Sequence, residues 1–227
     1  MPQAVVKVGG SLLFDEKGEL RAEYLRSLIV TLKLASQNSR LVVVVGGGQV
    51  ARKYIEAGRG LGASEGALDE VGIFASRLNA SLLFAAFYKT FPIIPTSLRE
   101  IRALTLSDLP VVFTGGLQPG QSTTTTAALI AEALSWDLVI ATDVSGIFDK
   151  DPKKYPDAKL LKQVMASDLL SKFSSNQVAG GYKLLDPLTL HIIIRSKRTV
   201  RVIAGEPSEN IARALSGENI GSVILPE

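Results

Sequence analysis

The sequence has no cysteine and a single histidine in its 227 residues. Without cysteine, the chain can form neither a disulfide nor a metal site built on thiolates. His191 lies within an apolar pattern of helical spacing, and no Ser-His-Asp triad can be built without it. We therefore expect His191 to be structural rather than catalytic.

Long apolar runs and a strong charge of one sign are also missing. No apolar run reaches the ~18 residues of a membrane span, and the start MPQAVVKVGG lacks the basic segment that opens a signal peptide. The net charge is +3 with both signs well mixed, so there is no dense basic stripe for nucleic acid. This balance suits small anionic substrates. We expect a soluble, cytoplasmic protein that binds neither membranes nor nucleic acid.

Two nucleotide-binding motifs can be set aside or ranked lower. The motif G-x-x-x-x-G-K-[ST] is absent, so the chain is not a P-loop NTPase. Gly46-x-Gly48-x-x-Ala51 does fit the dinucleotide fingerprint, and Asp69 follows at roughly the spacing of 20 residues that this fingerprint requires. However, no strand runs into Asp69, and the fingerprint follows the second predicted strand instead of the first. A nicotinamide site is therefore the weaker interpretation.

What the sequence does contain is an alternation of strand and helix patterns that is typical of βαβ units. With 46% apolar residues, the chain can bury a full core as one α/β domain or as two closely fused lobes, with a soft boundary near Thr114. We predict strands at 4–8, 41–45, 111–113, 138–142, 200–204 and 222–225, and helices at 20–36, 67–84, 127–134, near 210–215 and after the capping box Ser97-x-x-Glu100.

The most informative segment is Leu41–Arg52, LVVVVGGGQVAR. Its β-branched run is typical of a strand that is buried on both faces of a parallel sheet. The three glycines let backbone N–H groups approach an anion closely, and the dipole of the following helix adds positive potential there. We interpret the segment as a phosphate-binding turn, with the guanidinium of Arg52 in reach of the same oxygens.

A similar turn opens the chain, where the predicted strand carries Lys7 and leads into Gly9-Gly10-Ser11. Lysine is disfavoured inside a strand, so Lys7 is either a solvent-facing edge residue or a functional cation. The adjacent glycine pair favours function. Two glycine turns, each with a cation, suggest a ligand with several phosphates or two phosphorylated ligands that meet.

The loop 114–126, TGGLQPGQSTTTT, lies between a predicted strand and a predicted helix. Its glycines and hydroxyls can face a ligand at the carboxyl end of the strand, where open α/β sheets bind ligands. For Thr124–Thr126 the alternative is a run of hydroxyls that caps the next helix. The segment Gln118–Gln121 exceeds what capping needs.

The loop 142–151, TDVSGIFDKD, combines several acids with the aromatic Phe148. This composition suits a loop that stacks on a base, contacts a ribose or lies next to a metal. Asp143, Asp149 and Asp151 could equally form turns, and we expect at least one of them to do so.

Taken in order, these motifs resemble the amino acid kinase superfamily and, within it, the archaeal-type uridylate kinases. The resemblance is collinear, covers nearly the full length, and implies a single domain over 1–227. It implies a three-layer αβα sandwich with a mainly parallel central sheet, an acceptor-binding half at about 1–114 and an ATP-binding half at about 115–227. The matching segments are Lys7-x-Gly9-Gly10-Ser11, Gly46-Gly47-Gly48-x-x-x-Arg52, Leu68-Asp69, Ser76-Arg77-Leu78-Asn79-Ala80, Gly115-Gly116-x-Gln118-Pro119-Gly120, the pattern ATDVxGIFxxDP at 141–152, and Leu185-Asp186-Pro187.

The resemblance implies transfer of the γ-phosphoryl group of ATP to UMP with Mg²⁺, which gives ADP and UDP in pyrimidine nucleotide biosynthesis. It also implies that the protein is a homo-oligomer, namely a hexamer. Such a reaction needs positioning and charge neutralisation rather than a nucleophilic side chain. By the same resemblance, Lys7 and Arg52 would be catalytic, and no residue is assigned to a resident metal. ATP would be bound by Lys7, Gly9, Gly10, Ser11, Gly48, Arg52, Thr142, Asp143, Phe148 and Asp151, and UMP by Gly47, Asp69, Leu117, Gln118, Pro119, Gly120, Gln121, Ser122 and Thr123.

The chain departs from the family pattern in two places. Many relatives carry an aspartate where this chain has Thr124, and that aspartate is thought to organise catalytic cations; here the role falls to Asp143, to Mg²⁺ or to no group. Many relatives also have Asp-Gly in place of Ser145-Gly146, and tyrosine in place of Phe148.

Other members of the superfamily fit the sequence less well. Isopentenyl phosphate kinase is expected to place a histidine near its glycine turn, and residues 46–69 contain none. Acetylglutamate and carbamate kinases would require a different acceptor loop. A non-catalytic nucleotide sensor or oxyanion-storage protein on the same fold stays open because of Thr124, although the intact Lys7 and Arg52 argue against it.

Overall fold

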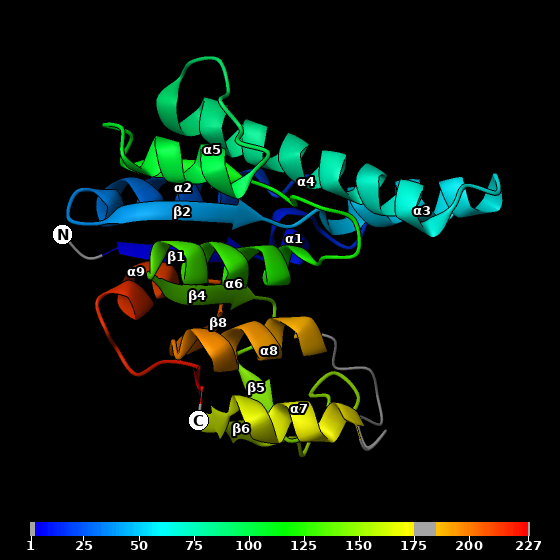
Figure 1. Ribbon diagram of the computed structural model, residues 1–227, viewed down its shortest axis with the longest axis vertical. Helices are drawn as coiled ribbons and strands as arrows, with labels where there is room; N and C mark the ends of the chain where they lie inside the picture. The colour runs from blue at the N-terminus through cyan, green and yellow to red at the C-terminus, as the bar shows by residue number, and fades with distance from the viewer. Residues whose placement is uncertain (1–2, 175–184, 227) are drawn as a thin grey trace.

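The computed structural model describes residues 3–174 and 185–226 (Figure 1). Its main sheet has the strand order β3-β2-β1-β4-β8-β9-β7. Neighbouring strands are parallel except for the antiparallel pair β8 and β9. The strands are β1 Gln3–Val8, β2 Arg40–Val45, β3 Val111–Thr114, β4 Asp137–Thr142, β7 Gln163–Met165, β8 Val200–Ala204 and β9 Ser222–Leu225, and a separate antiparallel pair joins β5 Ile147–Phe148 to β6 Leu160–Leu161.

Helices cover both faces of this sheet, which confirms the predicted three-layer αβα architecture. Alternate residues of β1 and β2 point into two different apolar clusters, one shared with α1, α2, α4 and α9 and the other with α5, α6 and α8. In Figure 1, α6 and α8 lie in front of the sheet, and α3 runs beside the N-terminal part of α4 beyond the end of β2. The helices are α1 Gly10–Leu13, α2 Ala22–Ser36, α3 Gly48–Gly60, α4 Glu65–Tyr88, α5 Leu98–Thr105, α6 Thr123–Leu134, α7 Ala166–Ser174, α8 Pro187–Ser196 and α9 Glu209–Leu215.

The predicted strands and helices are all present, whereas the short strands β5, β6 and β7 and the helix α7 were not predicted. The other errors lie at helix ends. Helix α6 begins at Thr123 instead of residue 127, because Ser122 caps it by accepting a hydrogen bond from the Thr125 N–H at 3.0 Å. The alternative that Thr124–Thr126 form the cap is therefore wrong; these threonines lie buried inside the first turns. His191 lies on the exposed side of α8.

Helix α4 extends four residues beyond its predicted end, to Tyr88. Among the described residues, it is the helix long and apolar enough to cross a membrane by length and composition alone. However, its buried side packs Ala80, Leu83 and Phe84 into the core beside β2 and β3. Its apolar character is therefore explained by its place as a core helix.

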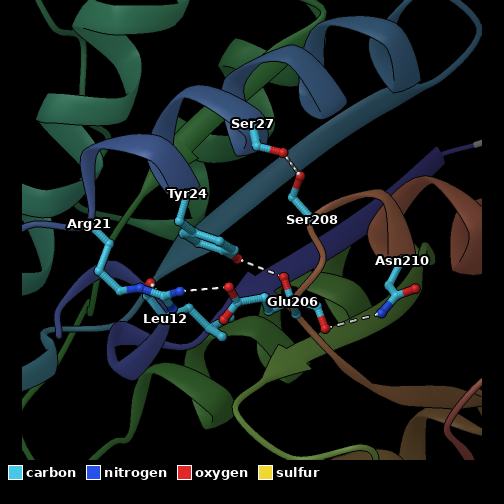
Figure 2. Close-up of polar contacts among 8 residues, drawn as sticks. Leu12, Arg21, Tyr24, Ser27, Glu206, Ser208 and Asn210 are labelled. Atoms are coloured by element: carbon cyan, nitrogen blue, oxygen red, sulfur yellow. Dashed lines mark hydrogen bonds and ion pairs between the residues drawn. The ribbon is translucent and has the colours of Figure 1, made fainter. Parts of the chain in front are cut away.

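Polar contacts fix the start of α2 against the segment that follows β8, as Figure 2 shows. Arg21 pairs with Glu206 at 2.6 Å and also donates to the Leu12 carbonyl at 3.4 Å, while the Tyr24 hydroxyl donates to the Gly205 carbonyl at 2.9 Å. Burial raises the pKa of Tyr24, so its hydroxyl remains a donor at neutral pH. These bonds tie α1 to the end of β8.

Candidate functional site

A cavity of about 490 Å³ lies at the carboxyl ends of β1, β2 and β4. This is where the sequence predicts ligand binding, because the loops after neighbouring parallel strands converge at one edge of a sheet. Both glycine turns open onto it. Its lining consists of Lys7, Gly9, Gly10, Ser11, Gly46, Gly47, Gly48, Arg52, Thr123, Thr124, Thr142, Asp143, Val144, Asp151 and Lys153.

The two glycine turns pack directly against each other. A Cβ atom on Gly10 would lie 2.2 Å from the backbone nitrogen of Gly48, which no side chain could tolerate. Gly48 also has a φ of +64°, in the left-handed region that favours glycine. Helix α3 begins at Gly48, which lines the cavity together with Gly47, and backbone N–H groups at a helix start can bind an anion.

Lys7 is buried at the end of a central strand, so the alternative that it is an edge residue is wrong. Burial lowers the pKa of the Lys7 ammonium to about 8, and the charge of Asp143 opposes part of this effect. At neutral pH the Lys7 ammonium is therefore mainly charged. Such a cation is well placed to neutralise charge that builds up on a phosphoryl group.

Asp143, which directly follows β4, contributes a carboxylate to the lining of the cavity. It accepts hydrogen bonds from the Lys153 ammonium and, at 3.2 Å, from the Thr142 hydroxyl. Its partial burial would raise the pKa of the Asp143 carboxyl, but the hydrogen bond and charge of Lys153 outweigh that effect and hold the pKa below its usual value. Asp143 is therefore ionised at neutral pH, and it faces Lys7 with a full negative charge.

The other two acids of this loop have different roles. Asp151 lines the cavity, although one of its oxygens also accepts the backbone N–H of Lys153 at 3.0 Å. Asp149 accepts the backbone N–H of Lys159 at 2.8 Å and lies outside the cavity lining, which confirms that at least one acid is a turn former. Phe148 lies in β5 and also falls outside the lining, so its contact with ATP stays a prediction.

Arg52 lies one turn into α3 and lines the cavity with an exposed side chain. Glu56 lies one turn further along the same helix, but in the described part of the chain no ion pair joins it to Arg52. The guanidinium is thus available for an anion in the cavity.

A smaller cavity of about 170 Å³ adjoins the first and shares Gly47, Gly48 and Thr123 with it. Asp69 from α4 and Gln121 from the loop between β3 and α6 line this second space. Asp69 also accepts the backbone N–H of Gly120 at 2.7 Å, which fixes the loop on the helix. The structure therefore brings Asp69 and part of the 117–123 loop to the edge of the phosphate-binding turn.

Some predicted residues lie outside both of these cavities. Leu117, Gln118, Pro119 and Gly120 belong to the correct loop but line neither space. Ser122 is occupied by its capping bond and by a hydrogen bond to Asp186 at 2.7 Å, which leaves it a structural role in this conformation.

Sequence reasoning missed Lys153, which lies in the cavity beside Asp143. The only available signal was a lysine two residues after Asp151, in a loop expected to contact nucleotide. No cluster of three or more histidine or acidic residues that could hold a metal occurs in residues 3–174 and 185–226. The carboxylates that could approach a cation in the cavity are Asp143 and Asp151.

Comparison with known proteins gives consistent matches. Residues 2–204 match the amino acid kinase family. The uridylate kinase of Thermofilum pendens is 52% identical over 98% of this chain and 97% of its own length, and that of Sulfolobus acidocaldarius is 43% identical over 98% of each. The crystal structure of uridylate kinase from Archaeoglobus fulgidus superposes with a TM-score of 0.86 at 38% identity, covering 97% of this chain and 99% of that one.

Proposed function

The chain belongs to the amino acid kinase family, and we propose that it is a UMP kinase, which transfers the γ-phosphoryl group of ATP to UMP to give UDP and ADP. The observation that carries this proposal is the pair of adjoining cavities, which meet at Gly47, Gly48 and Thr123. One space is large and lined by cations, and the other is small and lined by Asp69. Two phosphorylated ligands can therefore meet at one glycine turn.

The residues of the larger cavity suit the donor. The ammonium of Lys7 would neutralise charge on the transferring group, and the N–H groups after Gly47 would hold the phosphates. Arg52 would bridge donor and acceptor, since its planar fork can bind oxygens of both phosphates. In the smaller cavity, the Asp69 carboxylate can accept hydrogen bonds from ribose hydroxyls. The roles of Phe148 and the 117–120 segment remain predictions from the family resemblance.

We further propose that Mg²⁺ enters with ATP instead of occupying a dedicated protein site. Mg²⁺ is commonly held by one or two carboxylates together with substrate phosphates and water. Asp143 and Asp151 fit this requirement because both line the cavity. When bound, the ion would neutralise charge on the β- and γ-phosphates.

We propose a homo-oligomer, and a hexamer in particular, on the basis of the family resemblance and of one exposed surface. Helix α4 exposes Phe74, Leu78 and Leu82 to 58%, 65% and 40%, at a spacing that places them on one side of the helix. A second copy could cover this apolar stripe. The lack of cysteine and the mixed charge are compatible with a cytoplasmic enzyme of pyrimidine nucleotide biosynthesis. A single domain is supported by the main sheet, which contains strands from both halves of the chain. Light scattering on the purified chain would give its oligomeric state.

The function is tested by coupled detection of ADP, with ATP and Mg²⁺ as the donor. UMP, dUMP, CMP, isopentenyl phosphate, acetylglutamate and carbamate are compared as acceptors. We expect UMP to give the highest kcat/KM and Lys7→Met to give almost no turnover. Binding of ATP and UMP without ADP release would instead support the sensor or storage alternative, and faster turnover of another acceptor would indicate a different kinase.

A further inference from the structure

Helix α4 presents a buried amide to the phosphate-binding turn. Asn79 is only 5% exposed, and its side-chain amide nitrogen donates to the Gly46 carbonyl at 2.8 Å and to the Gly47 carbonyl at 3.2 Å. The amide group has two donors, and both are used on consecutive peptide groups of one turn. A buried side chain that serves only to fill space would not need this arrangement.

One turn earlier, the same helix binds the loop 115–122 between β3 and α6, which we call the acceptor loop. The Ser76 hydroxyl accepts the Gly116 N–H at 2.8 Å and donates to the Ile73 carbonyl at 2.7 Å. The Arg77 guanidinium donates from Nε to the Gly116 carbonyl at 3.0 Å. These bonds occupy both polar groups of Gly116, so the loop has a fixed position relative to α4.

The backbone of each loop also rests directly on α4. A Cβ atom on Gly115 would lie 2.6 Å from the backbone nitrogen of Arg77, and one on Gly47 would lie 3.3 Å from the carbonyl oxygen of Gly72. The first contact excludes any side chain at Gly115. The two glycine loops therefore pack against one rigid helix, within about two turns of each other.

Peptide geometry links the Asn79 bonds to phosphate binding. In a trans peptide, the carbonyl of one residue and the N–H of the next point in opposite directions. When Asn79 holds the carbonyls of Gly46 and Gly47, it turns the N–H groups of Gly47 and Gly48 away from α4. Gly47 and Gly48 line both cavities, so these donors are aimed where the two phosphates would meet.

We propose that Asn79 is a positioning residue for phosphoryl transfer, and that α4, through Asn79 and Ser76, sets the separation between the phosphate-binding turn and the acceptor loop. This inference rests on the proposed UMP kinase function. In-line transfer depends on the alignment of attacking and leaving oxygens, so a small displacement of one loop affects the transition state more than the binding of either substrate.

The test compares Asn79→Asp and Asn79→Ala with Leu83→Ala. Aspartate keeps the size of the side chain but offers no amide donors to the two carbonyls. Leu83 lies one turn further along α4, is 1% exposed and belongs to the apolar core, so Leu83→Ala is a control for loss of stability alone. We expect both Asn79 variants to lose kcat by on the order of 10- to 100-fold, with KM for ATP and UMP changed only a few-fold.

Each variant is assayed at a temperature where circular dichroism shows it to be folded. We expect Leu83→Ala to lower Tm while it keeps kcat within about twofold of the original enzyme. If kcat of the Asn79 variants stays near that of the original enzyme, or falls no more than that of Leu83→Ala at a matched loss of Tm, the proposal is wrong. Absence of UMP phosphorylation in the unmodified protein would instead refute the proposed function itself.

Ser76→Ala provides an independent variant and decides the question if neither Asn79 variant folds. It removes the acceptor of the Gly116 N–H without touching the phosphate-binding turn. We expect it to raise KM for UMP more than KM for ATP and to lower kcat as well. Equal, small changes in both KM values with an unchanged kcat would show that α4 does not align the two loops.

Discussion

Replacing Lys7 by methionine is expected to inactivate the protein and, in the absence of nucleotide, to stabilise it. Lys7 is buried in β1, and its pKa falls from the usual 10.5 to about 8 chiefly through burial. This pKa difference corresponds to a cost of roughly 3 kcal/mol for keeping the buried ammonium charged at pH 7. Methionine has a similar length and no charge, so the Lys7→Met variant avoids that cost.

The sign of the pH dependence follows from the two pKa values. Between pH 8 and 10.5 the folded protein has released the Lys7 proton while the unfolded chain still holds it. Because the unfolded state then binds more protons, the free energy of unfolding rises with pH across this window. The stability advantage of Lys7→Met should therefore be largest below pH 8 and should shrink as the pH approaches 10.5.

Thermal denaturation without nucleotide measures this effect. A gain of up to about 3 kcal/mol corresponds to a rise in Tm of up to about 6–12 °C for a chain of this size. Under the same conditions kcat should fall by ~10²-fold or more, because the ammonium acts mainly on charge in the transition state. A Tm at pH 7 equal to or below that of the original protein would refute the reasoning about burial, and more than half the original kcat would refute the catalytic role.

Three further substitutions test the site. Arg52→Lys should leave Tm unchanged, since no ion pair of Arg52 occurs in the described residues. It should reduce kcat/KM by a factor that corresponds to on the order of 1–3 kcal/mol of lost charge-assisted hydrogen bonding. An unchanged kcat/KM would show that Arg52 does not bind the substrates. Asp69→Asn should chiefly raise KM for UMP, and a comparison with dUMP tests the ribose contact, which is wrong if the original enzyme and the variant discriminate the two equally. Asp143→Asn should lower the pKa of Lys7 further, because Asp143 raises it. The alkaline limb of the kcat/KM profile for ATP should then move to lower pH, whereas a limb that does not move would contradict the electrostatic link.

The strands were predictable because their signal is local. A run such as Leu41–Val45 has to be buried on both faces, and it lies between two parallel neighbours, β1 and β3, as expected. Helix starts were harder to predict, because a run of hydroxyls offers several possible caps. Ser122 is selected by its position and by Asp186, which lies 64 residues away in the sequence and holds both Ser122 and Thr125.

The outline of the candidate site was predictable for a related reason, since strand ends with glycine and a cation mark phosphate binding wherever they occur. The roles of individual acids were not. Asp143 and Asp149 belong to the same short loop, yet Asp143 faces the cavity and Asp149 holds the Lys159 backbone. That difference depends on the pairing of β5 with β6, which two-residue strands do not reveal in a sequence.

The two glycine turns have the same local appearance, but the structure makes them depend on each other. Gly10 and Gly48 approach so closely that a methyl group on either would push the turns apart. Asn79 and Ser76 then fix the second turn and the acceptor loop on one helix. A sequence pattern can identify each glycine run separately, because each run directly follows its own strand. It cannot identify the buried amide 33 residues away that sets how the turns meet, since an asparagine within an apolar helix carries no sign of which carbonyls it will bind.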